Sequence, residues 1–376
     1  MNKVPRIVWT LLACVFCIVV TAACCLLIGD NSITSDKYLE VIQALEDNSV
    51  YEIDSVSLQD ASASAIVSSL DDSWSYYMSP EDYAEYQLYA SNEFVGIGVT
   101  TAYNSKYGYL YVTSVTEKSP AALAQIEVGN MITAVNGTDI SSFSPDDLEG
   151  YLKSFGEDEF ELSLLNAQGG VRSVRLACQI IYLSPVTWEL LEDGGIGYIK
   201  ISNFEAGCGD AVKAAIEYLK KEGARSLIFD VRDNPGGLVT ELKNVLDLLL
   251  PKGDLFICRD KLGREVVYSS DSSQEELPMD VTVNTASENE AEMFAAVIQN
   301  FGAATVVGQR TSGNGHNQII VELSDKSAVR ISRYVYLTAE RKDLQTLGGV
   351  VPDIKSSPFE DSSLDVILEA AKDVVS

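Results

Sequence analysis

Two polar stretches of the sequence gather the residue types that could carry out covalent chemistry. The first is "NTASENEAEMFAAVIQNFG", Asn284 to Gly302, where a short polar loop precedes a helix-like run rich in Ala and Phe. The second is "TSGNGHNQ", Thr311 to Gln318, which contains His316, the one histidine of the chain. A hydroxyl that is activated by a neighbouring base attacks acyl groups. The chemistry to consider first is therefore acyl transfer.

These residues alone are compatible with two kinds of site. A Ser287–His316 pair needs only a hydrogen-bond distance to act as nucleophile and base, with an adjacent glutamate orienting the imidazole. A hard cation such as calcium is the other occupant, because it prefers carboxylate and amide oxygens, although the spacing is not that of a regular calcium loop. The side chains that could surround such a cation are Glu288, Asn289, Glu290 and Asn314.

Metal and cofactor sites of other kinds find little support in the sequence. The chain has seven cysteines, and only Cys178, Cys208 and Cys258 lie beyond the apolar amino-terminal run. These three are widely spaced, which is neither a disulfide framework nor a CxxC metal motif. A single histidine argues against a zinc site built from histidines. We predict no metal and no cofactor.

The overall charge narrows the range of partners. The formal net charge is −28, which repels nucleic acid and anionic lipid headgroups. We therefore predict that the protein does not bind nucleic acid.

The amino terminus carries an uncharged apolar run from Ile7 to Ile28. At 1.5 Å per residue this run spans roughly 33 Å, enough to cross a bilayer. Lys3 and Arg6 precede it, so the positive-inside rule places the short amino end in the cytoplasm. We predict a single-pass anchor in the cell membrane with the bulk of the chain extracytoplasmic. A cleaved signal peptide and a lipid-anchored Cys24 are the alternatives.

The remaining sequence divides by pattern into an amino-terminal helical segment, a β-rich domain, an α/β core and a final helix. Residues 30–92 are helical in pattern, and Ser79 followed by Pro80 is typical of a helix start. Short β-rich runs divided by Gly and Asn-Gly turns follow. Strands then alternate with helices, which favours a largely parallel sheet with crossover helices. The predicted divisions are 1–29, 30–92, 93–183, 184–357 and 358–376.

The β-rich domain resembles a PDZ domain. "FVGIGV" looks like the carboxylate-binding loop that enters the first strand, and "SPAALAQIEVGNMITAVNG" is similar to the helix and turn that follow, with Asn130 in place of the usual Asp. Such a domain takes an extended peptide beside a sheet edge and holds its terminal carboxylate on backbone N–H groups. The resemblance implies a peptide-binding loop made of Phe94, Val95, Gly96, Ile97 and Gly98.

From Asp71 to Ile354 the chain resembles the carboxyl-terminal processing proteases, also called tail-specific proteases. The motifs that carry the resemblance, in the family's order, are "DDSWSYYMSPEDY", "IGYIKISNF", "SLIFDVRDNPGGLV", "TVVGQRTSGNGHNQ" and "GGVVPDI". The family implies a membrane-anchored or secreted endopeptidase with a crotonase-like α/β core and an inserted PDZ domain. It also implies a Ser-Lys dyad that cleaves near the carboxyl termini of substrates.

The two dyad positions of the family carry asparagine in this sequence. Aligned on Val283 and Glu292, the central Ser of the family's S-A-S-A-S-E motif falls at Asn289, and the dyad Lys falls at Asn314. The separation, 314 − 289 = 25, is the one the family pattern uses. An amide side chain is neither a useful nucleophile nor a base near neutral pH. Losing both members removes the mechanism.

Part of the apparatus persists around these positions. Gln318 stands where the family keeps a Gln that supports the lysine, and Gly236 and Gly237 belong to the loop expected to donate an oxyanion N–H. Glu288 and Glu290 add negative charge where an oxyanion would develop, which is the wrong sign for acyl transfer.

The sequence favours a catalytically inactive, membrane-anchored homologue that binds protein or peptide C-termini. The alternative is an active serine-type endopeptidase that uses Ser287 and His316. A third hypothesis is a structural partner for an active family member, through helix exchange at the region Ser35 to Leu70. A homo-oligomer is the other possible assembly.

Overall fold

The computed structural model describes residues 35–166, 168–191, 195–271, 275–357 and 364–375. The predicted anchor at 7–28 and Cys24 lie outside the described residues. None of the helices in the described ranges combines the length and the apolar character needed to cross a bilayer. The chain divides into two compact units, residues 1–63 and residues 64–376.

Helices dominate the segment before residue 92, as the sequence predicts. Helix α2 spans Ser35–Asn48 and α3 spans Ser55–Ser68. Strand β1 (Tyr76–Met78) precedes α4 (Pro80–Ala90). The Ser79 side chain caps α4 and accepts from the backbone N–H of Asp82, whose side chain accepts in return from the backbone of Ser79. This reciprocal capping box and the proline in the first turn fix where α4 begins.

The β-rich domain is built on one sheet with the order β3-β4-β5-β7-β8, in which β6 pairs with β5. Strand β3 (Val99–Asn104) lies at its edge, and α6 (Pro145–Lys153) begins with a second capping box at Ser144. A separate pair, β2 (Glu93–Gly96) with β9 (Gln179–Tyr182), closes the domain. The remaining elements are β4 (Tyr109–Val115), α5 (Pro120–Leu123), β5 (Met131–Val135), β6 (Thr138–Asp139), β7 (Phe160–Leu165) and β8 (Val171–Leu176).

The core of the second unit is a six-stranded sheet with the order β10-β11-β12-β15-β16-β19. Five of these strands run parallel, and only β10 pairs antiparallel with its neighbour. The largely parallel α/β core expected from the alternating pattern is therefore confirmed. The strands are β10 (Val186–Leu191), β11 (Ile196–Ile201), β12 (Ser226–Asp230), β15 (Met279–Val283), β16 (Ala304–Gly308) and β19 (Ile354–Lys355).

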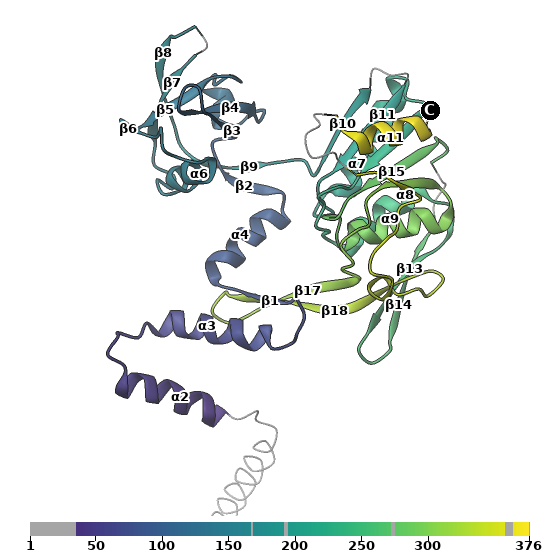
Figure 1. Cartoon of the computed structure of the whole chain (residues 1–376), viewed down its shortest axis with the longest axis horizontal. Coiled ribbons are helices and arrows are strands. Elements are labelled where there is room, and N and C mark those ends of the chain that lie inside the picture. Colours follow the sequence, from purple (N-terminus) through teal and green to yellow (C-terminus); the bar gives the residue numbers. More distant parts are fainter. Residues whose placement is uncertain (1–34, 167, 192–194, 272–274, 358–363, 376) are drawn as a thin grey trace, which may run out of the picture. The chain divides into compact units, whose positions relative to one another are not determined.

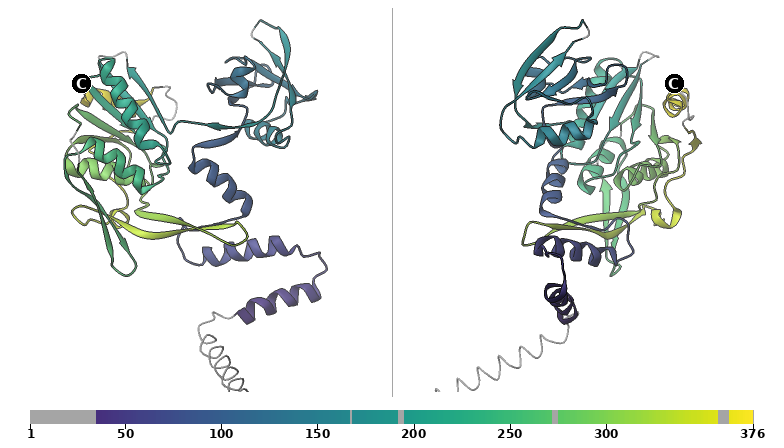
Figure 2. Two further views of the ribbon diagram at one scale, coloured as in Figure 1. Left: turned by 180° about the vertical axis from the view of Figure 1, so that it is seen from behind. Right: turned by 60° about the vertical axis from the view of Figure 1, so that its left-hand side comes forward.

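Helices bury both faces of this sheet. Helices α7 (Cys208–Lys221), α8 (Val239–Leu249) and α9 (Glu290–Phe301) pack with Leu227 and Phe229 of β12 into the main hydrophobic cluster. The neighbouring Ile228 instead belongs to a second cluster, under α11 (Val366–Val375). Because side chains alternate along a strand, α11 covers the face opposite to the other three helices. Figure 2 shows α11, in yellow, on the outside of the sheet.

A second, antiparallel sheet was not predicted as a separate unit. The hairpin of β17 (His316–Glu322) and β18 (Ala328–Thr338) pairs with β1 and with β13 (Gly253–Asp260), and β13 pairs in turn with β14 (Glu265–Ser270). Figure 1 shows this hairpin beside β1. The short helix α10 (Leu344–Leu347) follows β18. The sequence pattern marks β17 and β18 as strands, but it carries no information on which sheet they join.

Candidate functional site

Asn289 occupies a sharp turn between strand β15 and helix α9. It is the residue before the first helical position, with φ 50° and ψ −114°. Such backbone angles are costly for any residue with a Cβ, and strain of this kind concentrates at functional turns. The side chain is only 2% exposed, and its Nδ2 donates to Pro235 O at 3.2 Å. Within the described part of the chain its Oδ1 has no hydrogen-bond partner.

The neighbouring hydroxyl, Ser287, is committed to the fold. It is fully buried, and its Oγ donates to Val231 O at 2.8 Å and accepts from the N–H of Asn284 at 3.1 Å. No hydrogen bond joins it to His316 among the residues described, and His316 lies in β17, half-buried and paired with Val335. The alternative hypothesis requires a hydrogen bond between Ser287 and His316. The described residues do not show this hydrogen bond.

The loop Asn234–Gly237 faces the turn at Asn289. Gly236 and Gly237 have φ of 99° and 151°, and a Cβ on Gly237 would lie 2.4 Å from the backbone carbon of Phe204. Glycine is therefore required there on both conformational and steric grounds. The N–H of Gly236 donates to Asn234 Oδ1 at 2.8 Å, and the N–H of Gly237 donates to Glu290 Oε2 at 2.8 Å.

Glu290 is a buried carboxyl held on both oxygens. Tyr336 donates its hydroxyl to Oε1 at 2.5 Å, and Asn317 Nδ2 donates to the same oxygen at 3.3 Å. Oε2 accepts from Gly237, and the backbone N–H of Glu290 also bonds to its own carboxyl. Burial raises the pKa of Glu290, while these hydrogen bonds oppose the rise.

A second buried carboxyl, Glu292, positions the loop that carries Asn314. It accepts from Thr311 Oγ1 at 2.5 Å, from Ser312 Oγ at 3.0 Å and from the N–H of Gly313 at 2.7 Å. Burial raises its pKa despite these bonds. The loop therefore depends on a carboxyl one helical turn into α9 from the sharp turn at Asn289.

Asn314 itself is fully buried and only weakly bound. Gln318 Nε2 lies 3.5 Å from its Oδ1, while in the described structure its Nδ2 has no partner. Arg330 donates to the other end of the Gln318 amide at 3.0 Å. The amino group of Gln318 also donates to His316 O at 3.3 Å and to Ser332 Oγ at 3.2 Å, so Asn314 receives only the longest of its three contacts.

A cavity of about 340 Å³ opens between these elements. Glu205, only 3% exposed, lines it together with Glu290 and Arg330. Its Oε2 has no hydrogen-bond partner in the described residues. Burial raises the pKa of Glu205 to about 7, and the neighbouring charges of Glu290 and Glu241 act in the same direction against Arg330. The other lining residues are Tyr86, Tyr89, Pro235, Gly236, Gly237, Leu238, Gln318, Ile319 and Ile320.

Models of known protein families match two parts of this chain. Residues 195–356 match the model of peptidase family S41, and residues 85–165 match the model of the PDZ domain. The chain therefore contains a peptidase family S41 domain and a PDZ domain. The resemblance found in the sequence is thereby confirmed, and the sharp turn at Asn289 lies within the S41 match.

Two similar proteins carry protease names. A carboxyl-terminal-processing protease of Synechocystis is 27% identical, over 82% of this chain and 75% of that protein. A probable CtpA-like serine protease of Staphylococcus saprophyticus is 28% identical, over 88% of this chain and 67% of that protein.

Solved structures agree with this assignment. The photosystem II D1 C-terminal processing protease is 25% identical, with a TM-score of 0.50 and 90% of each chain covered. A putative S41 protease from Bacteroides fragilis shares the fold, with a TM-score of 0.58, 18% identity, and 83% of this chain and 89% of that chain covered.

The PDZ domain has a groove of its own. A cavity of about 300 Å³ lies along edge strand β3 and helix α6, and residues 94–98 line it. The structure thus places all five predicted peptide-binding residues on one groove. Gly98 has φ 82°, and a Cβ there would lie 2.2 Å from the Cβ of Ser119. This glycine is needed for the loop to approach the start of α5.

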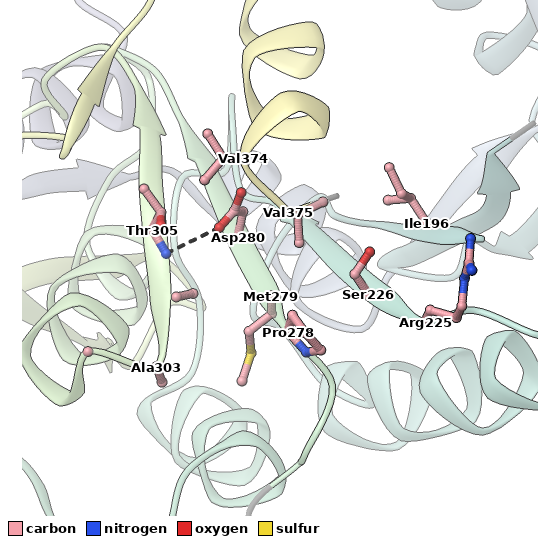
Figure 3. A pocket seen from close by; sticks show the side chains of 12 residues that line it. Ile196, Arg225, Ser226, Pro278, Met279, Asp280, Ala303, Thr305, Val374 and Val375 are labelled. Atoms are coloured by element: carbon pink, nitrogen blue, oxygen red, sulfur yellow. Dashed lines mark hydrogen bonds between the residues drawn. The ribbon is translucent and has the colours of Figure 1, made fainter. Parts of the chain in front are cut away.

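A wider recess of about 760 Å³ lies at the other end of the S41 sheet (Figure 3). Ile196, Ser226, Met279 and Ala304, which line it, are the first residues of four parallel strands. Ligands of open α/β sheets bind at the carboxyl ends of the strands, where Asn289 follows β15. Burial raises the pKa of Asp280, which faces this recess, to about 6. This recess is therefore separate from the S41 site.

Sequence reasoning missed the contact between Glu290 and Gly237. The sequence shows Glu290 where the family motif S-A-S-A-S-E has Ala, and we interpreted it only as a charge of the wrong sign. The Ala-to-Glu difference was the available signal. The roles of Glu205 and Arg330 had no local signal, because both reach the cavity from elements distant in sequence.

We predict that Glu205→Gln flattens the pH dependence of stability. The folded pKa of about 7 exceeds the ordinary 4.5, so the folded state binds more protons between these values and stability falls as pH rises through this window. A neutral amide at position 205 removes this loss of stability. At about 1.36 kcal/mol per pKa unit, the loss in the free energy of unfolding is at most roughly 3 kcal/mol. Urea unfolding at pH 5 and pH 8 measures it.

The matched control for this measurement is Glu322→Gln, a change at an exposed position on β17. The control should keep the wild-type pH dependence. A Glu205→Gln protein that loses as much stability between pH 5 and pH 8 as the wild type contradicts the assignment.

Proposed function

We propose that this protein is a catalytically inactive member of peptidase family S41 that binds protein C-termini through its PDZ groove and releases them uncut. The observation that carries the proposal is the pair of amide side chains at 289 and 314. They stand on a sharp turn and in a buried loop, at the two positions to which the resemblance assigns the family's dyad.

The chemistry of the two positions supports inactivity. Acyl transfer needs a hydroxyl at the turn and a neutral amine that takes its proton. Asn289 offers an amide that donates to Pro235 O, and Asn314 offers an amide next to Gln318. Neither side chain can accept a proton near neutral pH. The loss of a single dyad member costs several orders of magnitude in rate.

The rival function is an active endopeptidase that uses Ser287 and His316. The unpartnered Nδ1 of His316 in the described structure favours it. Against it, the Oγ of Ser287 is buried and donates to Val231 O. A serine hydroxyl that donates its hydrogen bond to a backbone carbonyl is not paired with a base that could remove its proton.

The PDZ groove supports the binding half of the proposal. Strand β3 is an edge strand, so its outer backbone groups are free to pair with an extended peptide. The loop with Gly96 and Gly98 lies at one end of the same groove and offers backbone N–H groups to a terminal carboxylate. Apolar side chains of α6 such as Leu148 favour an apolar last residue.

We also propose that residues 7–28 anchor the chain in the cell membrane, with the bulk outside the cytoplasm. The uncharged run and the two preceding basic residues support this. Assembly with a second copy or with an active family member, through residues 35–70, remains part of the same proposal. The exposed apolar side chains of α2, among them Leu39 and Val41, support an interaction there.

For catalysis, we predict that the full-length protein does not cleave an unfolded substrate with an apolar carboxyl tail. Peptide mapping by mass spectrometry after prolonged incubation should show only background cleavage, because the nucleophile and the base are missing. Ser287→Ala and His316→Ala should behave as the wild type does. Cleavage by the wild type that both substitutions abolish would establish the rival function.

For binding, we predict that the protein holds a peptide with an apolar last residue at least about tenfold more tightly as the free acid than as the amide, or about 1.4 kcal/mol. Glu149→Trp, which places a large ring in the groove, should weaken binding by a similar factor. Glu157→Trp, exposed and not among the groove-lining residues, is the matched control. Fluorescence anisotropy measures this, and equal affinity for acid and amide contradicts it.

For the anchor, we predict that the full-length chain stays in the membrane pellet after alkaline carbonate extraction, while a chain beginning at residue 31 does not. An intact mass that includes residues 1–28 supports an uncleaved anchor. A mature amino terminus within or just after this run, or a lipid on Cys24, would replace it with one of the alternatives.

A further inference from the structure

The backbone N–H groups around the sharp turn are already occupied in this protein. The N–H of Gly237 donates to Glu290 Oε2 at 2.8 Å. The backbone N–H of Glu290, directly after Asn289, bonds to the same carboxyl. The N–H of Gly236 is used by Asn234 Oδ1. The amides of Gly236, Gly237 and Glu290 therefore each have an internal partner.

The carboxyl is fixed in this position. Glu290 is only 2% exposed, and its second oxygen accepts from Tyr336 and Asn317. Swinging the side chain away would leave the buried Tyr336 hydroxyl and the buried Asn317 amide without these partners, which is unfavourable. The packing is also tight, because a Cβ on Gly236 would lie 2.4 Å from Glu290 Oε2.

The geometry of the contact is that of an oxyanion site. Donors of such a site lie 2.7–3.1 Å from the position of the developing oxyanion. We infer that the Glu290 carboxyl is a built-in occupant of the oxyanion hole, which blocks this site independently of the two asparagines. The inference rests on the proposed function in placing the acyl site at Asn289.

The occupied amides determine how variants with a restored dyad should behave. Restoring the dyad with Asn289→Ser and Asn314→Lys leaves the hole filled, so the substrate carbonyl cannot enter it. Removing one oxyanion donor costs about 10²–10³ in kcat. A third change, Glu290→Ala, shortens the side chain to the residue that the family motif has there and frees both amides.

We test this with four variants of the full-length chain and the unfolded substrate described above. The variant Asn289→Ser/Asn314→Lys should remain near background. Addition of Glu290→Ala should raise cleavage by at least about 100-fold. Addition of Glu290→Gln should not, because a glutamine oxygen still accepts from Gly237. Addition of Glu288→Ala is the matched control for charge, and it should not raise cleavage.

The inference is overturned if the double variant cleaves within about threefold of the Glu290→Ala triple variant. It is also overturned if Glu288→Ala raises cleavage as much as Glu290→Ala does, since charge alone would then explain the effect. Cleavage by the wild type would instead overturn the proposed function, and the exchange measurement below would still decide the inference.

A second readout needs no catalysis. Hydrogen exchange at the Gly237 amide, followed by NMR in the otherwise unaltered protein, should be slow in the wild type and in Glu290→Gln. It should be faster by at least about 100-fold in Glu290→Ala, because Gly237 is half-buried on the cavity and would lose its acceptor. Unchanged protection in Glu290→Ala overturns the inference even if every variant is inactive.

Discussion

The contact between the Asn234–Gly237 loop and the end of β11 is the constraint on which the rest of the site depends. Phe204 donates its N–H to Gly236 O and accepts from the N–H of Leu238, both at 2.8 Å. The carbonyl of Asn234 accepts from the N–H of Glu288 at 2.9 Å, and the Asn234 side chain donates to Ile201 O. One loop thus joins the end of β11 to the turn before α9, and only glycine fits at its tip. The sharp turn is held by the fold, whatever residue stands at its apex.

Two buried carboxyls at the start of α9 bind different parts of the site. Glu292 receives three hydrogen bonds from the loop at residues 311–313 and so fixes the position of Asn314. Glu290 receives its hydrogen bonds from Gly237, Asn317 and Tyr336. A buried carboxyl is stable only when its oxygens are bonded, and each of these two is. The first fixes the loop before Asn314, and the second joins the Gly237 loop to β17 and β18.

The fold and the site differ in how far the sequence could predict them. The strand at Ala328–Thr338 and the helix starts at Ser79 and Ser144 follow from local pattern and capping chemistry, so they agree with the structure. The pairing of β1 with β18 joins residues 250 to 254 positions apart, and no local pattern encodes it. The same holds for the cavity, where Glu205, Glu290 and Arg330 meet from three separate elements. Motif order located the two asparagines, but hydrogen-bond partners across the cavity are decided by packing.

The hydrogen bonding at the two asparagines contrasts with that at Glu290. In the described residues, Asn289 Oδ1 is a buried acceptor without a donor and Asn314 Nδ2 is a buried donor without an acceptor. An unsatisfied buried polar group costs about 1–3 kcal/mol, so both substitutions leave a cost in the folded state. At Glu290 the opposite holds, since both carboxyl oxygens and the Gly237 amide are satisfied. The Gly237 amide is bonded to a buried carboxyl, so this contact contributes to the stability of the fold, whatever the chemistry of the site.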